Sequence, residues 1–238
     1  MKIFICAAII ATLFCISGQA QPFEPNRYTD LSSVALLKQK DSLKKALVCP
    51  SFFKEKETQK KFKEYWESRT DYLVTAISDN SFIQQQKVYD YLQQILQDII
   101  KGNKSYFKSQ PLLLVDRSSS VNAYAMGNNV LAVNLGLLSF AETREEVALV
   151  MAHELAHNIL DHALKSMKER AETFTSDEYK ESLKSVLDSK FGRYSRLKKI
   201  MEGYVYNSAK HNRYHEEEAD SLAITLLANS NIAFNPAA

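Results

Sequence analysis

A mostly helical α+β fold with one small sheet is predicted by three features of the sequence. Only 6 Gly and 5 Pro occur among the 238 residues, which is few for the many turns of an all-β protein and leaves long helices uninterrupted. Apolar residues recur at helical spacing through most of the first hundred positions. A short apolar run and a hairpin signal follow between 112 and 133, so we expect helices packed on a small sheet with a β-hairpin at its edge.

The length and charge suit a globular protein with one large domain, or a domain with a helical appendage. Apolar residues make up 45% of the chain, charged residues make up 24%, and the formal net charge is +2. A charge this close to zero gives no reason to expect nucleic acid as a partner. We expect an N-terminal helical region over residues 21–105 and a core over residues 106–238, with a helical insertion at about 163–210.

The first twenty residues have the pattern of a secretory signal peptide. Lys2 supplies the positive start, residues 3–16 an apolar stretch, and Gly18-Gln19-Ala20 a small-residue end. We expect cleavage after Ala20 and an exported protein, periplasmic or otherwise extracytoplasmic, with no integral membrane span once the signal is removed.

Two alternatives to simple cleavage stay open. The segment can remain as an uncleaved anchor, or a lipid can be attached at Cys15, although the bulky Phe14 before it disfavours that route. Cleavage would leave Cys49 as the single cysteine of the mature chain. We therefore expect no internal disulfide.

Helical spacing continues through the N-terminal region in three stretches. The first covers 31–48, the second carries the aromatic residues near 53–66, and the third covers about 71–100 with a break near 78–81. The apolar stripes of these stretches are typical of packing surfaces rather than ligand pockets. They indicate no function.

Short strands follow, and then a capped helix. The run 112–115 is wholly apolar, and 121–125 and 130–133 flank Gly127-Asn128-Asn129, whose residues tolerate positive φ in a tight turn. Thr143 and Glu146 have capping-box spacing, so we expect a helix to begin there. Its apolar positions keep helical spacing as far as Leu155.

This helix carries an HExxH motif, in His153, Glu154 and His157. Residues four apart lie on the same side of a helix about one turn apart, so both imidazoles can reach one metal ion. Glu154 points to the side of that face, where it can hold a water bound to the metal. The plain alternative is a pair of exposed histidines on a solvated helix.

A catalytic zinc site needs a third protein ligand. A histidine six residues after His157 would serve, but that position is Ala163, and His162 is expected beside the histidines or at the surface. Glu216 is the better candidate, with Asp220 one turn later to accept the outer N–H of a ligating histidine. The alternative is that residues 216–220 are acids in a first helical turn, where they favour the helix dipole.

Together these residues resemble those of the HtpX-like and CaaX-prenyl-protease-type zinc metallopeptidases, a gluzincin family with a zincin-like fold. The shared features are the strand from Leu112, Asn122-Ala123-Tyr124, Gly136-Leu137-Leu138, the helix Glu146 to His157, His162 and Glu216-Glu217-Glu218-Ala219-Asp220. The resemblance implies that the sheet packs on the HExxH helix and that the first Glu of an ExxxD pattern, here Glu216, is the third ligand. It also implies that a peptide substrate pairs with the edge strand bearing Asn122, Ala123 and Tyr124.

Two departures from the family are visible. Some relatives have membrane spans between the two motifs, whereas residues 163–210 contain no such span and hold ten Lys or Arg against six Asp or Glu between 165 and 199. Relatives also usually continue beyond the point where this chain stops, so we expect either a compact domain or a fragment of a longer chain. The oxyanion-stabilising residue is therefore open, with His211, Arg213 and Tyr124 as candidates.

The sequence thus predicts a zinc-dependent metalloendopeptidase with one Zn²⁺ per chain and Glu154 as general base. Its expected substrates are peptides or unfolded proteins outside the cytoplasm, and a role in envelope protein quality control would suit an exported member. The alternatives are a non-catalytic, zinc-stabilised envelope binding or chaperone-like protein and a metal-dependent amidase.

Overall fold

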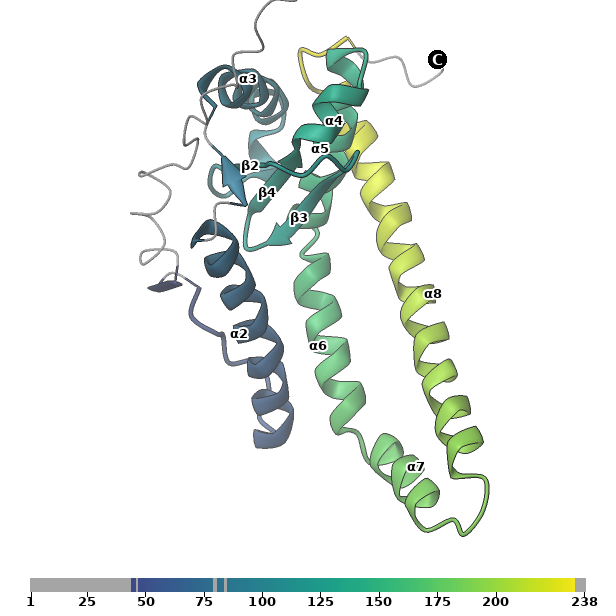
Figure 1. Cartoon of the computed structure of the whole chain (residues 1–238). Coiled ribbons are helices and arrows are strands. Elements are labelled where there is room, and N and C mark those ends of the chain that lie inside the picture. The colour runs from purple at the N-terminus through teal and green to yellow at the C-terminus, as the bar shows by residue number, and fades with distance from the viewer. Residues whose placement is uncertain (1–43, 46, 79–80, 84, 234–238) are drawn as a thin grey trace, which may run out of the picture. The chain divides into compact units, whose positions relative to one another are not determined.

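The computed structural model describes residues 44–45, 47–78, 81–83 and 85–233 (Figure 1). The fold is mostly helical with one small mixed sheet, as the sequence predicted. The signal peptide expected at 1–20 and most of the helix expected at 31–48 lie outside the described residues. The helices are α2 (Lys56–Ser78), α3 (Gln86–Gly102), η1 (Lys104–Tyr106), α4 (Leu135–Phe140), α5 (Arg144–Ile159), α6 (His162–Thr175), α7 (Asp177–Leu187) and α8 (Arg193–Ala228).

The sheet has four strands in the order β1-β2-β4-β3. They are β1 (Phe82–Ile83), β2 (Leu112–Asp116), β3 (Ala123–Gly127) and β4 (Val130–Asn134). Strands β2 and β4 are parallel, whereas β3 pairs with β4 in the predicted antiparallel hairpin. The hairpin turns at Asn128 and Asn129, whose φ angles are 51° and 61°, so asparagine fills the left-handed positions that such turns require. Strand β3 is therefore a sheet edge.

Helices cover both faces of the sheet. On one face, buried side chains of α3, α5 and the C-terminal part of α8 form the main core with residues of β2, β3 and β4. On the other face, Leu73, Ala76 and Ile77 of α2 pack on Leu114, Met126 and Ala132. Helix α3 lies in the expected N-terminal region, yet it shares its core with α5. The HExxH helix thus packs directly on the sheet.

Residues 163–210, expected as a helical insertion, lie in α6, α7 and the first half of α8. Phe174, Tyr179 and Tyr204 contact one another through their rings and join the three helices. Helix α6 also packs on α2, with Ala171 beside Phe62 and Trp66. Among the described residues, no helix combines the length and the apolar character needed to cross a membrane.

Two element boundaries differ from the sequence prediction. The stretch expected at about 71–100 breaks after Ser78, as predicted, but its first part belongs to α2, which begins at Lys56, and the two-residue strand β1 lies between α2 and α3. Strand β1 is too short to produce a periodic pattern. Helix α8 begins at Arg193 and runs for 36 residues, so residues 216–220 lie inside it rather than at its start. The interpretation of those acids as a first helical turn is therefore wrong.

Candidate metal centre and active site

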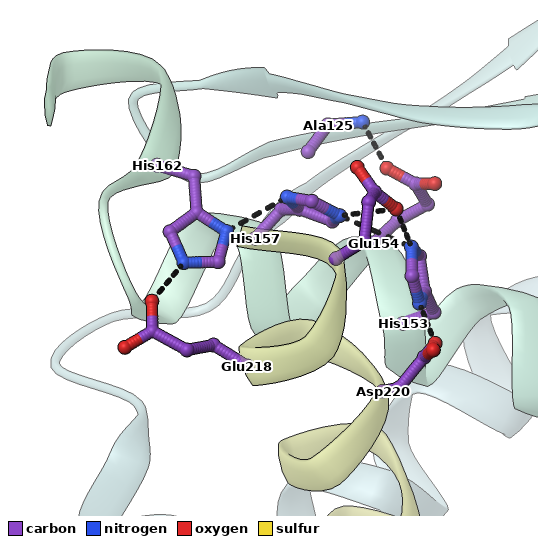
Figure 2. A network of polar contacts seen from close by, with 8 residues as sticks. Ala125, His153, Glu154, His157, His162, Glu218 and Asp220 are labelled. Carbon is purple, nitrogen blue, oxygen red and sulfur yellow. Dashed lines mark hydrogen bonds and ion pairs between the residues drawn. The ribbon is translucent and has the colours of Figure 1, made fainter. Parts of the chain in front are cut away.

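Helix α5 is anchored at its start and along one face. The Thr143 hydroxyl accepts the N–H of Glu146 at 3.2 Å, as predicted, but the Glu146 carboxylate accepts the N–H of Glu142 rather than that of Thr143. The buried face consists of Val147, Ala148, Met151, Ala152, Leu155 and Ala156. With that face held in the core, His153 and His157 project from the other side of α5 toward α8 (Figure 2).

The two imidazoles converge with Glu216 of α8. The Nε2 atoms of His153 and His157 lie 3.0 Å apart, and Oε2 of Glu216 lies 3.2 Å and 3.6 Å from them. Tetrahedral bonds of about 2.0–2.2 Å would place neighbouring ligand atoms about 3.3–3.6 Å apart around a zinc ion. The three atoms therefore have the spacing of three ligands of one metal ion, and they are a group of the described residues able to hold one.

Close packing of α8 on α5 brings Glu216 to this position. Ala219, Ala223, Leu226 and Leu227 of α8 are buried, and the small alanines let the two helices approach closely. Glu216 and Asp220 lie one turn apart beside this buried face. Both carboxylates therefore reach the histidines from one helix.

The outer nitrogen of each histidine has its own partner. Nδ1 of His153 lies 2.9 Å from Oδ1 of Asp220, the contact that the sequence predicted. Nδ1 of His157 lies 2.9 Å from Nδ1 of His162, which was not predicted as a specific contact. If both Nε2 atoms point at a metal, each Nδ1 must carry the proton and donate it outward.

His162 is suited to accept that proton only as a neutral imidazole. Its Nδ1 must then be an acceptor, so its Nε2 carries the hydrogen and donates to Oε2 of Glu218 at 3.1 Å. Burial lowers the pKa of His162 to about 4, which favours the neutral form. The ring also stacks on His215 with centroids 4.2 Å apart.

The turn between α5 and α6 explains why helical spacing in the sequence did not predict the position of His162. Helix α5 ends at Ile159, and Asp161 adopts a left-handed φ of 55° before α6 begins at His162. This turn brings the buried His162 ring back toward His157. Helical geometry extrapolated from His157 would have turned it away.

Glu154 lies beside the two histidines and contacts the sheet edge. Its Oε2 accepts the backbone N–H of Ala125 at 2.7 Å (Figure 2). Burial raises the pKa of Glu154, while the Ala125 N–H and His153 partly oppose the rise. A carboxylate whose pKa lies above its usual range is better matched to proton transfer near neutral pH. Burial also lowers the pKa of His157, which favours the neutral imidazole that binds metals.

Strand β3 presents its free edge to this site. Asn134 donates to the Asn122 carbonyl at 3.1 Å, and Tyr124 pairs with Ala132. Because bonding alternates along an antiparallel strand, Ala123 and Ala125 direct their backbone groups away from β4. At Ala125 the N–H is held by Glu154 and the carbonyl accepts from Arg69 at 3.4 Å. Ala123 is the next outward-facing residue.

The three candidates for the oxyanion-stabilising residue do not contact the histidines. The Tyr124 side chain packs with the α2 face of the sheet, and its hydroxyl donates to Asp116 at 2.6 Å, so it does not face the histidines. His211 lies 3.5 Å from Glu169, and Arg213 is exposed. These positions give the three residues no contact with the metal-site cluster among the interactions described.

Comparison with known proteins gives an independent view of this arrangement. A family model described as peptidase family M48 matches residues 86–238, more than half of the chain. The match begins where α3 begins, in agreement with the shared core of α3 and α5.

Two curated relatives each match about half of the chain. A protein of Vibrio cholerae serotype O1 named beta-barrel assembly-enhancing protease is 30% identical over 121 residues, which are 50% of this chain and 25% of the relative. The metalloprotease YcaL of Escherichia coli K12 is 34% identical over 116 residues, which are 49% of this chain and 44% of the relative. The match thus spans less than half the length of either relative.

Proposed function

This chain belongs to peptidase family M48 and is a metallopeptidase by that membership, and on that premise we propose that it is a zinc-dependent endopeptidase. His153, His157 and Glu216 hold the zinc ion, and Glu154 is the general base. Asp220 fixes the orientation of His153. The observation that carries the proposal is the convergence of two Nε2 atoms and one carboxylate oxygen within 3.0–3.6 Å of one another.

The chemistry follows from where the side chains lie. A bound zinc ion supplies a Lewis acid for the scissile carbonyl and lowers the pKa of a coordinated water to about 7. Glu154 takes a proton from the attacking water and passes it to the leaving amine. The Ala125 N–H holds the Glu154 carboxylate at the sheet edge, and Ala123 offers backbone groups to an extended peptide. The segment Asn122–Tyr124 therefore contributes to substrate binding through its backbone.

The test separates metal binding from catalysis. Glu154→Gln should retain one zinc per chain and lose cleavage of unfolded casein by about 10²–10⁴-fold, the usual contribution of a general base. Glu216→Gln should lose zinc, whereas Glu217→Gln, on the next residue of α8, should keep both zinc and cleavage. Unchanged cleavage by the Glu154 variant contradicts the assignment. Wild-type protein with full zinc but no cleavage of any unfolded protein would instead support the zinc-stabilised binding protein.

We also propose that the protein acts outside the cytoplasm, in quality control of envelope proteins. The signal-like pattern of residues 1–20 supports export, and the name of the Vibrio cholerae relative refers to beta-barrel assembly. Fractionation of cells together with mass determination of the mature N-terminus tests the first part. A mature protein that begins at Gln21 and leaves the cytoplasm is expected, and a full-length cytoplasmic chain contradicts it.

A further inference from the structure

The turn between α7 and α8 exposes large apolar side chains. Leu187, Phe191 and Tyr194 expose 68%, 86% and 82% of their surface. Further along α8, Leu197, Met201 and Val205 are also exposed. Together with Tyr194 they follow the spacing of one helical stripe, so they form a continuous apolar strip rather than scattered positions.

Packing within the insertion does not use these side chains. The rings that join α6, α7 and α8 are Phe174, Tyr179 and Tyr204. At 100° per residue, Tyr204 lies on the flank of the apolar strip that turns toward α7, and the strip itself turns outward. The exposed residues therefore form a surface without a partner among the described residues.

The segment that carries this strip is basic. Between 184 and 205 the chain has six Lys or Arg, namely Lys184, Lys190, Arg193, Arg196, Lys198 and Lys199, and two acids, Asp188 and Glu202. The net charge of the whole chain is only +2, so the positive charge is a local property of this segment. Arg193 and Lys198 flank the apolar strip on its two sides, which gives the first turns of α8 an amphipathic, cationic character.

We propose that residues 184–205, the basic tip, dock on the surface of an anionic phospholipid bilayer. Phe191 and Tyr194 enter the headgroup region, where aromatic side chains are favoured, and Lys190 together with the flanking Arg193 and Lys198 neutralises lipid phosphates. A bilayer fits this combination because it offers negative charge and apolar depth across one continuous surface. An acidic protein patch would match the charge alone.

Docking would also position the proposed active site. Helix α8 is continuous from the basic tip to Glu216. The 22 residues from Tyr194 to Glu216 span about 33 Å of helix. A docked tip would therefore hold the metal centre on a rigid helical arm near the membrane. This inference does not depend on peptidase activity.

The experiment is co-sedimentation of the full mature chain with vesicles. Wild-type protein should bind vesicles containing phosphatidylglycerol at least tenfold more tightly than vesicles of phosphatidylcholine alone, and binding should weaken as salt rises. The triple variant Lys190→Glu, Arg193→Glu, Lys198→Glu should lose at least tenfold in affinity. Because Arg193 also donates to the Ser189 carbonyl at 2.7 Å and supports the turn, circular dichroism of this variant checks that its helical content is retained.

Matched variants distinguish an effect of the basic tip from an effect of the net charge of the protein. Lys54→Glu, Lys56→Glu, Lys60→Glu changes three exposed lysines near the start of α2 and should leave vesicle binding within twofold of wild type. Phe191→Ser with Tyr194→Ser should weaken binding about fivefold while helical content and casein cleavage in solution stay unchanged. Equal binding to neutral vesicles, equal loss in both triple variants, or tip-dependent dimerisation in sedimentation without vesicle binding would each overturn the proposal.

Discussion

Each histidine of the candidate metal centre is oriented by a chemically different partner. His153 contacts the exposed carboxylate of Asp220, whereas His157 contacts the buried imidazole of His162, which in turn contacts Glu218. A carboxylate can rearrange in solvent after a mutation, but a buried imidazole stacked on His215 has little freedom. The orientation of His157 should therefore depend strongly on His162.

Replacement of His162 should weaken zinc binding. His162→Ala leaves the Nδ1–H of His157 without its buried acceptor, and loss of such an outer partner typically lowers metal affinity 10–100-fold. His162→Asn keeps an acceptor near that position and should recover part of the affinity. Competition with a chromophoric chelator measures both variants, and an altered d–d spectrum of the cobalt-substituted His162→Ala protein reports the geometry. Unchanged affinity in His162→Ala would show that His157 is oriented by something else.

The Ala125 N–H should matter for catalysis rather than for metal binding. Ala125→Pro removes the N–H that holds Glu154, and because this N–H points away from β4, no bond between strands is lost. We expect kcat to fall about tenfold or more with zinc content unchanged, since a misplaced catalytic group can lower the rate 10²-fold. Steady-state kinetics and metal analysis test this. A fall confined to KM would indicate that the N–H serves substrate binding instead.

The sequence predicted which residues form the candidate centre but not all of what supports them. His153, His157 and Glu216 come together as helical spacing and the acidic pair predicted. His162 was not assigned a contact because the left-handed residue Asp161 redirects the chain, and φ at a single Asp is not encoded in apolar spacing. The hydrogen bond from the Ala125 N–H to Glu154 was not predicted either, because every residue type except proline offers a backbone N–H.

At the level of elements, α8 is held to the core by an asparagine clasp at its C-terminal end. The Asn103 side chain donates to the carbonyls of Ile99 and Leu226, both at 2.8 Å, and accepts from Asn229 at 3.1 Å. Asn103 is almost fully buried. A Cβ at Gly102 would lie 1.8 Å from the Asn229 carbonyl oxygen, so only glycine permits this approach of α3 to α8.

Disruption of this clasp should destabilise the protein without touching the site. Asn103→Ala removes three hydrogen bonds and leaves buried polar groups of α8 unpaired, so the free energy of unfolding should fall by about 1–3 kcal/mol. Urea denaturation of the chelated protein measures the change. Asn229→Ala, which removes one of the three bonds, is the milder comparison, and equal stability of Asn103→Ala and wild type would contradict the account.

The positions of helices and strands were predicted more reliably than the residues at which the helices begin and end. The buried stripe of α5 and the hairpin of β3 and β4 follow from local spacing and turn chemistry. The extent of α2 from Lys56 to Ser78 and the start of α8 depend on tertiary packing, because α2 covers the far face of the sheet and α8 continues through the aromatic contacts of Tyr204. Neither contact is visible in a local pattern.

For the whole molecule, metal binding and folding stability should be linked. The ligands come from two helices, α5 and α8. His157 and Glu216 are 59 residues apart in the sequence, so a bound ion would connect distant segments of the chain. A ligand present at 1,000 times its Kd stabilises the native state by about 4 kcal/mol, which for a chain of this size is a shift in Tm of roughly 8–16 °C. Chelation should lower the Tm of wild type accordingly.

The matched control for that measurement is Glu216→Gln. Its Tm should be insensitive to chelator, because the third ligand is lost, whereas Glu217→Gln should respond like wild type. A Tm that is independent of chelator in all three proteins would show that metal binding does not contribute to folding stability.

A crystal structure of the mature protein with zinc, located by anomalous scattering at the zinc edge, tests the metal centre most directly. If these residues hold the metal, one strong peak should lie about 2.0–2.2 Å from Nε2 of His153, Nε2 of His157 and a carboxylate oxygen of Glu216. A peak elsewhere, or Glu216 turned away from both rings in the zinc-bound protein, would contradict this assignment.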